Sequence, residues 1–376
     1  MGLFSALTSV LTSSSKSISS TGNTDPNLES RFFGLSNFGN TCYCNSVIQA
    51  LFHCKDFRNS LIDTLAAETK SLPTTPLSPF EQEKAFTSHF NDSQPNLRGI
   101  KEQNDEEKSL FYALRDLFIK LRAQKKQTGY LQPKKLILSI KQKNEIFQNS
   151  AQHDAHELLN FVLNTIDEEM KEKSCVKELF KGTLANETRC CNCETITRRE
   201  EDFIDLSLEI EQNVSISNCM AKFSAKELLA GKNKFFCDVC QSYQEAEKRM
   251  LIKNLPKIQI IQLKRFKYVE RVQRLIKLSH RVAFPFEIQF NNTTLDCEHR
   301  FKNYSLFAVV VHIGSGMAQG HYVTLIRHED KWICFDDDRV IVTNDQYVEH
   351  VFGQAIDGQT SISETGYILF YERIEE

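Results

Sequence analysis

Apolar residues in the first half of the chain recur at helical spacing. This spacing predicts a helix that begins after Thr41, a second over about 110–121 and a third over about 151–172. The stretch 66–109 is polar and contains several prolines, which predicts loops with room for one short helix. Residues 1–29 are rich in Ser, Thr and Asn and have little apolar surface to bury, so we expect a disordered arm there.

The pattern changes after Cys175, where short alternating or β-branched runs take over. These runs predict strands over 203–210, 258–263, 306–311, 322–326, 332–335, 340–342 and 367–371. One helix is predicted among them, because the segment Ser224 to Glu227 has the form of a capping box and Gly231 is typical of a helix end. Helices first and strands later predict an α+β fold rather than a doubly wound sheet.

Composition narrows the classes of function. The chain has 376 residues, 41% of them hydrophobic, so a core can form without staples; length alone favours two or three units, with one large domain also open. The net charge of −3 argues against a nucleic-acid partner, and no apolar run reaches the roughly 18 residues of a membrane span. The basic stretch 120–143 is interpreted as a solvated face, with a site for a specific anionic partner as the alternative. Acylation of Gly2 is not favoured, because Ala6 stands where the motif needs Ser or Thr.

Four of the 12 cysteines form two C-x2-C pairs, Cys190 with Cys193 and Cys237 with Cys240. Two such pairs supply four thiolates, which is enough for one closed, tetrahedral, structural zinc site. The stretch between the pairs is longer than the roughly 15–20 residues of compact zinc ribbons, so the pairs are expected to close the ends of a protruding sheet. The alternative is a set of reduced cysteines in a hairpin, or a redox pair.

Cys42 is the candidate nucleophile. It follows Asn40 and Thr41, which are residue types that begin helices, and the first helical turn favours a thiolate over a thiol. Asn37 has a side-chain amide that is a candidate donor to an oxyanion. The alternative for Cys42 is an ordinary buried cysteine at the start of a helix.

A nucleophilic cysteine needs a base, and His321 is well placed because it lies between a glycine-rich loop and a predicted strand. Asp336 ends the next predicted strand. An antiparallel return would bring its carboxylate beside the His321 imidazole, which it would then orient. The chain has ten histidines, so the presence of one more is weak evidence for a catalytic base. A solvated turn is the alternative for the acidic residues at 336–338.

Taken in order, these motifs resemble those of the ubiquitin-specific protease family. The segment 34–46 resembles the cysteine box of that family, and the segment 320–337 resembles its histidine box. Between them, 152–158 resembles the Gln-Gln-Asp-Ala-x-Glu box, with His153 in place of the second Gln. The segment 263–266 resembles a further strand of the family.

The resemblance covers roughly Phe33 to Arg373 and implies a papain-like cysteine protease fold. It implies one catalytic domain over 30–376, and the two or three units suggested by length are set aside. Within that domain it implies a helical thumb over about 30–175, zinc-bearing β fingers over about 176–255 and a β palm over about 256–376.

The same resemblance implies catalytic roles. Cys42 would be the nucleophile, His321 the general base and Asp336 the third member of the triad. Asn37 would donate to the oxyanion, and Asp337 would support that pocket.

It also implies a surface for the substrate. Asp154 and Glu157 share a helical face and would hold the basic carboxyl-terminal tail of ubiquitin. Phe266 and Tyr322 would line the narrow channel for the two glycines of that tail, with core packing as the alternative for both.

The activity implied is that of a deubiquitinating cysteine protease, which hydrolyses the peptide or isopeptide bond after the last glycine of ubiquitin through a thioester. The segments 186–190, 201–207 and 265–268 resemble a small subgroup that WD40-repeat proteins activate. A cytoplasmic location is expected, with a nuclear one left open. The alternatives are a weakly active or inactive ubiquitin-binding scaffold that needs a WD-repeat partner, and a different thiol enzyme such as an acyl transferase or a protease for another ubiquitin-like tail.

Overall fold

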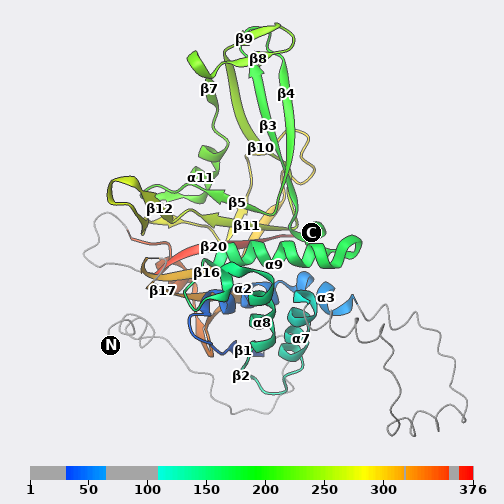
Figure 1. Ribbon diagram of the computed structural model, residues 1–376, viewed down its shortest axis with the longest axis vertical. Coiled ribbons are helices and arrows are strands. Elements are labelled where there is room, and N and C mark those ends of the chain that lie inside the picture. Colours follow the sequence, from blue (N-terminus) through cyan, green and yellow to red (C-terminus); the bar gives the residue numbers. More distant parts are fainter. Residues whose placement is uncertain (1–30, 65–108, 317–318, 355–363, 376) are drawn as a thin grey trace, which may run out of the picture.

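The computed structural model describes residues 31–64, 109–316, 319–354 and 364–375. Helices gather at one end of the molecule, a large sheet crosses its middle, and a narrower group of strands projects from the opposite end (Figure 1). The predicted disordered arm, Gly2 and nearly all of the polar stretch 66–109 lie outside the described residues. No helix of the described residues is long and apolar enough to cross a membrane.

All three predicted amphipathic helices are confirmed. They belong to a group of six, namely α2 (Cys42–His53), α3 (Lys55–Asp63), α7 (Leu110–Arg122), α8 (Lys134–Lys143), α9 (Ala155–Met170) and α10 (Cys175–Phe180), with short 3-10 turns at Glu145–Gln148 and Lys171–Lys173. Ser109 caps α7 by accepting a hydrogen bond from the Tyr112 amide, and Asp154 caps α9 in the same way. The apolar faces of these helices pack on one another and on one face of the sheet.

Eight strands form the large sheet, called here the central sheet. They are β5 (Asp205–Leu208), β11 (Ile258–Leu263), β15 (Glu287–Gln289), β16 (Asn303–Gly316), β17 (Gln319–His328), β18 (Lys331–Asp336), β19 (Arg339–Thr343) and β20 (Glu364–Arg373). The order is β19-β18-β17-β16-β20-β11-β5, with β15 also on β16, and every pairing is antiparallel except β11 with β5. The predicted strands are confirmed here, although the run 203–210 is divided at Ile204 between two strands.

Both faces of the central sheet are covered, as the period of two along its strands requires. Val310 and Ile368 belong to the core on the side of the helices. Their chain neighbours Val309 and Leu369 belong to a second core on the other face, which α11 (Ile216–Phe223) and α12 (Asp345–His350) help to close. The same alternation holds in β17, where Tyr322 belongs to the first core and Val323 to the second, so this strand is also held from both sides.

Four strands form the projecting sheet, in the order β4-β3-β10-β7. Their bounds are β3 (Gly182–Cys190), β4 (Ile196–Phe203), β7 (Glu227–Leu229) and β10 (Ala246–Asn254), and the hairpin of β8 (Phe235–Cys237) and β9 (Ser242–Gln244) lies at the far end (Figure 1). Every residue of β4 except Phe203 is exposed, so this sheet has little core of its own.

The helix predicted to begin at the capping box of Ser224 to Glu227 is wrong. The helix of this region, α11, begins eight residues after Leu208 and ends at Phe223, with Ser215 as its capping residue. Glu227–Leu229 is strand β7 because it pairs with β10, and Gly231 only opens a single 3-10 turn. Sheet pairing supplied by β10, which lies far along the chain, outweighs a local helix-start signal.

Three small two-stranded sheets complete the described chain. They pair β1 (Phe32–Leu35) with β2 (Thr128–Leu131), β12 (Phe266–Val269) with β13 (Arg274–Lys277), and β6 (Val214–Ser215) with β14 (Val282–Ala283). The first of them lies beside β19 and leads directly into the loop before α2, so it fixes the approach to Cys42.

Candidate active site

Cys42 is the first residue of α2 and is 2% exposed. Thr41 occupies the cap position but does not cap the helix with its side chain; its hydroxyl donates instead to Asn37 Oδ1, 3.1 Å away. The Thr41 amide donates to the same oxygen at 3.0 Å. The loop before Cys42 is therefore held by Asn37, and Asn40 takes a left-handed conformation with φ 57° to complete the turn.

His321 and Asp336 lie on the neighbouring antiparallel strands β17 and β18. His321 Nε2 is 2.5 Å from Asp336 Oδ1. Burial alone would lower the pKa of His321, but its hydrogen bonds with Asp336 and Cys42 raise it to about 10. At neutral pH the imidazole is therefore protonated, in contact with a carboxylate on one side and the Cys42 sulfur on the other.

Gln152 is a residue of this site that the sequence reasoning did not single out. Its Nε2 lies 3.5 Å from Cys42 Sγ and donates to the carbonyl oxygen of Gly320 at 2.6 Å. Its Oε1 accepts from the Gly320 amide at 2.8 Å. The only available signal was its place in the 152–158 box, because nothing in the local pattern shows that a loop before α9 folds across to β17.

Gly320 tolerates this arrangement because it has no side chain. A Cβ there would collide with the imidazole of the buried His312 and would lie 2.8 Å from the carbonyl oxygen of Ile313. Strand β16, which carries both of these residues, thus approaches the backbone directly before His321.

Asn37 and Asp337 are also in contact. Asn37 Nδ2 donates to Asp337 Oδ2 at 2.8 Å, and Asn45 Nδ2 donates to Oδ1 of the same carboxylate at 2.8 Å. Burial raises the pKa of Asp337 against the opposing effect of these two bonds. Gly34 permits the close packing, because a Cβ there would lie 2.5 Å from the Asp337 carbonyl oxygen.

Comparison with known proteins identifies the family. Residues 33–371 match the family described as ubiquitin carboxyl-terminal hydrolase. The chain is 40% identical to ubiquitin carboxyl-terminal hydrolase 12 of Salmo salar, over 91% of this chain and 89% of that protein. It is 39% identical to ubiquitin carboxyl-terminal hydrolase 4 of Arabidopsis thaliana, over 92% of this chain and 94% of that protein.

The chain belongs to the ubiquitin carboxyl-terminal hydrolase family. The predicted family, its papain-like α+β fold and the activity of a cysteine-type deubiquitinase are confirmed at this level. The residues that carry the activity in this hydrolase, and the bounds of thumb, fingers and palm, stay predictions.

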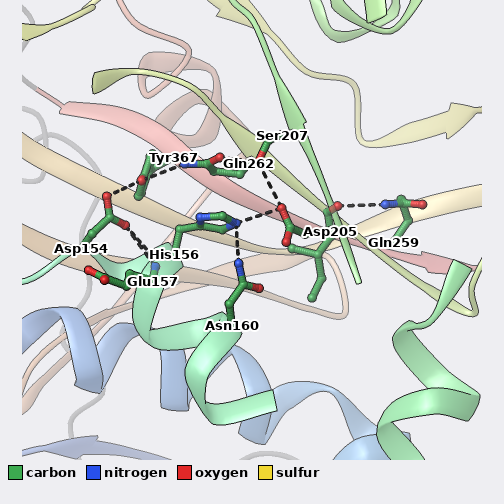
Figure 2. Close-up of polar contacts among 10 residues, drawn as sticks. Asp154, His156, Glu157, Asn160, Asp205, Ser207, Gln259, Gln262 and Tyr367 are labelled. Carbon is green, nitrogen blue, oxygen red and sulfur yellow. Dashed lines mark hydrogen bonds and ion pairs between the residues drawn. The ribbon is translucent and has the colours of Figure 1, made fainter. Parts of the chain in front are cut away.

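Two carboxylates predicted to hold the ubiquitin tail lie together at the start of α9 but differ in their surroundings (Figure 2). Asp154 Oδ1 accepts from the His156 amide at 2.7 Å, and Oδ2 accepts from the Tyr367 hydroxyl at 2.6 Å. Glu157 is exposed. Asp154 is therefore already engaged in holding its helix on the central sheet, whereas the carboxylate of Glu157 faces solvent.

Asp154 belongs to a closed ring of polar contacts that sequence reasoning did not foresee (Figure 2). His156 Nε2 lies 2.8 Å from Asp205 Oδ2. The single hydroxyl hydrogen of Ser207 is shared between that oxygen, 3.2 Å from Oγ, and Gln262 Oε1, 2.6 Å from Oγ. The ring continues from Ser207 through Gln262 to the Tyr367 hydroxyl and back to Asp154. It ties α9 to β5, β11 and β20, and its member Asp154 follows Gln152 by two residues in the chain.

The two aromatic residues predicted to line the channel are not equivalent. Tyr322 is 0% exposed, and its ring packs on His312 and Tyr367 at centroid distances of 4.8 and 6.2 Å. Phe266 is half-buried and packs on the same two rings from β12. Core packing, the alternative for both, describes Tyr322 in this structure, while Phe266 keeps an accessible side.

The four paired cysteines of this hydrolase meet at the end of the projecting sheet. Their sulfur atoms all lie within 4.8 Å of one another, with Cys190 and Cys240 at 4.0 Å and Cys193 and Cys237 at 3.6 Å. A tetrahedral zinc ion with Zn–S bonds of about 2.3 Å requires sulfurs about 3.8 Å apart. The cluster therefore fits such an ion.

Two matching turns bring these cysteines together. In each C-x2-C pair the residue after the second cysteine, Glu194 or Gln241, has a positive φ, of 60° and 52°. The Cys191 amide donates to the Glu245 carbonyl oxygen at 2.8 Å and ties the first turn to the residue between β9 and β10. Cys191 itself is exposed and lies outside the cluster.

Proposed function

We propose that this hydrolase cleaves after the terminal glycine of ubiquitin with Cys42 as nucleophile, His321 as general base and Asp336 as the group that orients the imidazole. The observation that carries the proposal is the position of His321 between the Cys42 sulfur and Asp336, with a pKa raised to about 10. An imidazolium beside a thiol at the first turn of a helix favours the thiolate that the chemistry needs.

The steps follow from this assignment. The Cys42 thiolate attacks the carbonyl carbon of the last glycine of ubiquitin, and the electron pair of the C=O bond moves to oxygen. When the tetrahedral intermediate collapses, the C–N bond breaks and the departing lysine amine takes the proton from His321. Water then gives a proton to His321 and attacks the thioester carbon; the C–S bond breaks and releases the thiolate, and the new ubiquitin carboxyl group loses its proton to solvent.

Asn37 is proposed to donate to the oxyanion, with Asp337 supporting it through the bond to Nδ2. Glu157 is proposed to attract the basic tail of ubiquitin, because its carboxylate is exposed. Asp154 is proposed to add its negative charge to this attraction, although both of its carboxylate oxygens already accept hydrogen bonds, from the start of α9 and from Tyr367. Phe266 is proposed to contact the two glycines of the tail, and Tyr322 to support the channel wall from behind.

A ubiquitin probe with an electrophilic carboxyl terminus tests the assignment. Wild-type protein should form one covalent adduct at Cys42, located by peptide mass spectrometry, and Cys42→Ala should form none while keeping its melting temperature. We expect the turnover of ubiquitin amides by Cys42→Ala to fall at least about 10⁴-fold. A folded Cys42→Ala protein with retained turnover would refute the nucleophile.

One structural zinc ion is proposed to bind Cys190, Cys193, Cys237 and Cys240. Four thiolates leave no open position for water, so the ion would hold the projecting sheet and take no part in chemistry. Elemental analysis should find about one zinc per chain, and a metal-free folded protein would contradict the proposal.

A WD40-repeat activator and a cytoplasmic location, with the nucleus left open, are further proposals that rest on sequence resemblance. Cleavage of ubiquitin conjugates with and without candidate WD40-repeat proteins tests the first, and cell fractionation tests the second. The scaffold alternative predicts no cleavage in either case. The joint placement of Cys42, His321 and Asp336 favours an enzyme over a scaffold.

A further inference from the structure

The side-chain amide that lies against the Cys42 sulfur in the described structure is that of Gln152, not that of Asn37. Gln152 Nε2 is 3.5 Å from Cys42 Sγ. The amide nitrogen of Asn37 is directed instead at the carboxylate of Asp337, 2.8 Å away. The donor predicted from the sequence thus has one of its two hydrogens bound to Asp337, whereas a second donor touches the atom that reacts.

The orientation of the Gln152 amide is fixed by its two bonds with Gly320. A backbone carbonyl oxygen can only accept and a backbone amide can only donate. The bond of 2.6 Å to the Gly320 carbonyl therefore requires Nε2, and the bond of 2.8 Å from the Gly320 amide requires Oε1. Reversing the amide would break both bonds, so it is the nitrogen that faces the sulfur.

A primary amide nitrogen carries two hydrogens. One of those on Gln152 is used by the Gly320 carbonyl, and the other is directed at Cys42 Sγ. The oxyanion of the reaction forms on the carbon that becomes bonded to this sulfur. A donor that already touches the sulfur needs only a small shift to reach the about 2.7–3.1 Å from the oxyanion at which such donors act.

We propose that Gln152 is a catalytic residue of this hydrolase, whose Nε2–H group donates to the oxyanion formed when Cys42 attacks the ubiquitin carboxyl terminus. The two bonds to Gly320 hold the donor close to its working position before substrate arrives, so that only a small shift is needed during the reaction. The inference rests on the proposed role of Cys42 and adds a donor to the proposed Asn37.

The test separates stabilisation of the oxyanion from positioning of His321. Gln152→Met keeps an unbranched side chain of similar length and removes the donor. With ubiquitin carrying a fluorogenic carboxyl-terminal amide, kcat should fall by about 10²–10³-fold, the usual cost of losing one such donor, while KM changes less than about threefold. The matched control is Gln148→Met, the same substitution at an exposed position four residues earlier, which should leave kcat unchanged.

Alkylation of Cys42 by iodoacetamide supplies the second measurement. The reaction needs the Cys42 thiolate with its imidazolium partner. The thiolate attacks the tetrahedral CH2 carbon of iodoacetamide, so no oxyanion forms. The alkylation rate of Gln152→Met should stay within about twofold of wild type, with an unchanged melting temperature and circular dichroism spectrum. A parallel fall in alkylation and kcat would show that Gln152 only positions its neighbours and would overturn the proposal, as would an unchanged kcat or an effect on KM alone.

The outcome is distinguishable from failure of the proposed function. If Cys42 is not the nucleophile, Cys42→Ala retains turnover whatever Gln152 does. If Cys42 is the nucleophile and Gln152 is not a donor, Cys42→Ala is inactive, and Gln152→Met either turns over normally or loses kcat and alkylation rate together.

Discussion

The central sheet and the projecting sheet hold their strands together by different means. In the central sheet, alternate residues such as Val310 and Val309 enter two separate buried cores, one on each face. In the projecting sheet nearly all of β4 is exposed. The inner strand β3 of this sheet carries Glu187, a buried carboxylate. It accepts from Arg198 of β4 and from Arg249 of β10, each at 2.8 Å. The first sheet is stabilised by burial, whereas the second has ion pairs and four clustered cysteines in place of such a core.

The two regions use cysteine in different ways. Cys42 depends on a scaffold that other residues provide, because α2 and β17 pack together in the larger core. In the projecting sheet the four paired cysteines take that supporting place themselves. They bring together two turns that have little apolar surface to hold them. A sheet without a core of its own is expected to gain its order from a metal.

The largest expected effect is the loss of the metal. Cys237→Ser removes one of four ligands, and structural zinc sites contribute roughly 10 kcal/mol or more to the order of the segment they hold. Zinc content should fall to near zero, and hydrogen exchange should accelerate in β3, β4, β8 and β9 but not in β16 or β20. Cys191→Ser is the matched control, because this neighbouring cysteine is exposed and lies outside the cluster. Equal acceleration in both sheets would break the comparison.

A cavity in the central sheet should have the next largest effect. Leu369 lies in β20 and is 0% exposed, so Leu369→Ala should lower the free energy of unfolding of the whole chain by about 2–5 kcal/mol. Leu228→Ala, in strand β7 of the projecting sheet, is the control; this leucine is 62% exposed and should cost less than about 0.5 kcal/mol. Urea denaturation measures both, and similar costs would contradict the division between the sheets.

The dependence of stability on pH should trace to the central sheet. The pKa of His321 is raised from 6.5 to about 10, so its pairing stabilises the folded state fully below pH 6.5 and this contribution is lost as pH rises through about 10. The difference in unfolding free energy between wild type and His321→Gln should therefore shrink over this window, by at most about 1.4 kcal/mol per pH unit. A constant difference would show that the pairing does not shift the pKa of His321.

The smallest expected effect concerns the ion pairs of the projecting sheet. Glu187→Gln keeps the volume of a side chain that is 4% exposed, and it removes the charge opposite two arginines that are 40% or more exposed. Because water screens such pairs, we expect a local cost of about 1 kcal/mol, seen as faster exchange in β3 and β10. Glu194→Gln is the control, since this carboxylate is 73% exposed in its pair with Arg189. No difference between the two variants would assign the order of this sheet to the metal alone.

Sequence reasoning succeeded where the interaction is local or periodic. Asp336 was found because an antiparallel return over 15 positions places it beside His321. The strand over 258–263 was predicted at its observed bounds, because a short run rich in β-branched isoleucine is typical of a strand. The four cysteines were found because two repeated turns impose a fixed spacing.

It failed where a distant segment decides. The helix predicted at 224–231 is a strand because β10 pairs with it. Gln152 was missed because its partner Gly320 is 168 positions away, and neither residue carries a local sign of the other. The engagement of Asp154 by Tyr367, 213 positions away, was missed for the same reason. Contacts of this kind depend on how helices dock on the sheet, which residue spacing does not encode.

The packing at Gly320 has a consequence for inherited variation. Every residue other than glycine has a Cβ atom, so every missense change at Gly320 introduces one. At this position a Cβ collides with His312 and crowds the carbonyl oxygen of Ile313. His312 is fully buried and cannot move aside without disturbing Tyr322 and Phe266, whose rings pack against it. All missense changes at Gly320 should therefore act alike whatever residue they introduce, and a clinical or breeding survey of such alleles would treat the position as a single class.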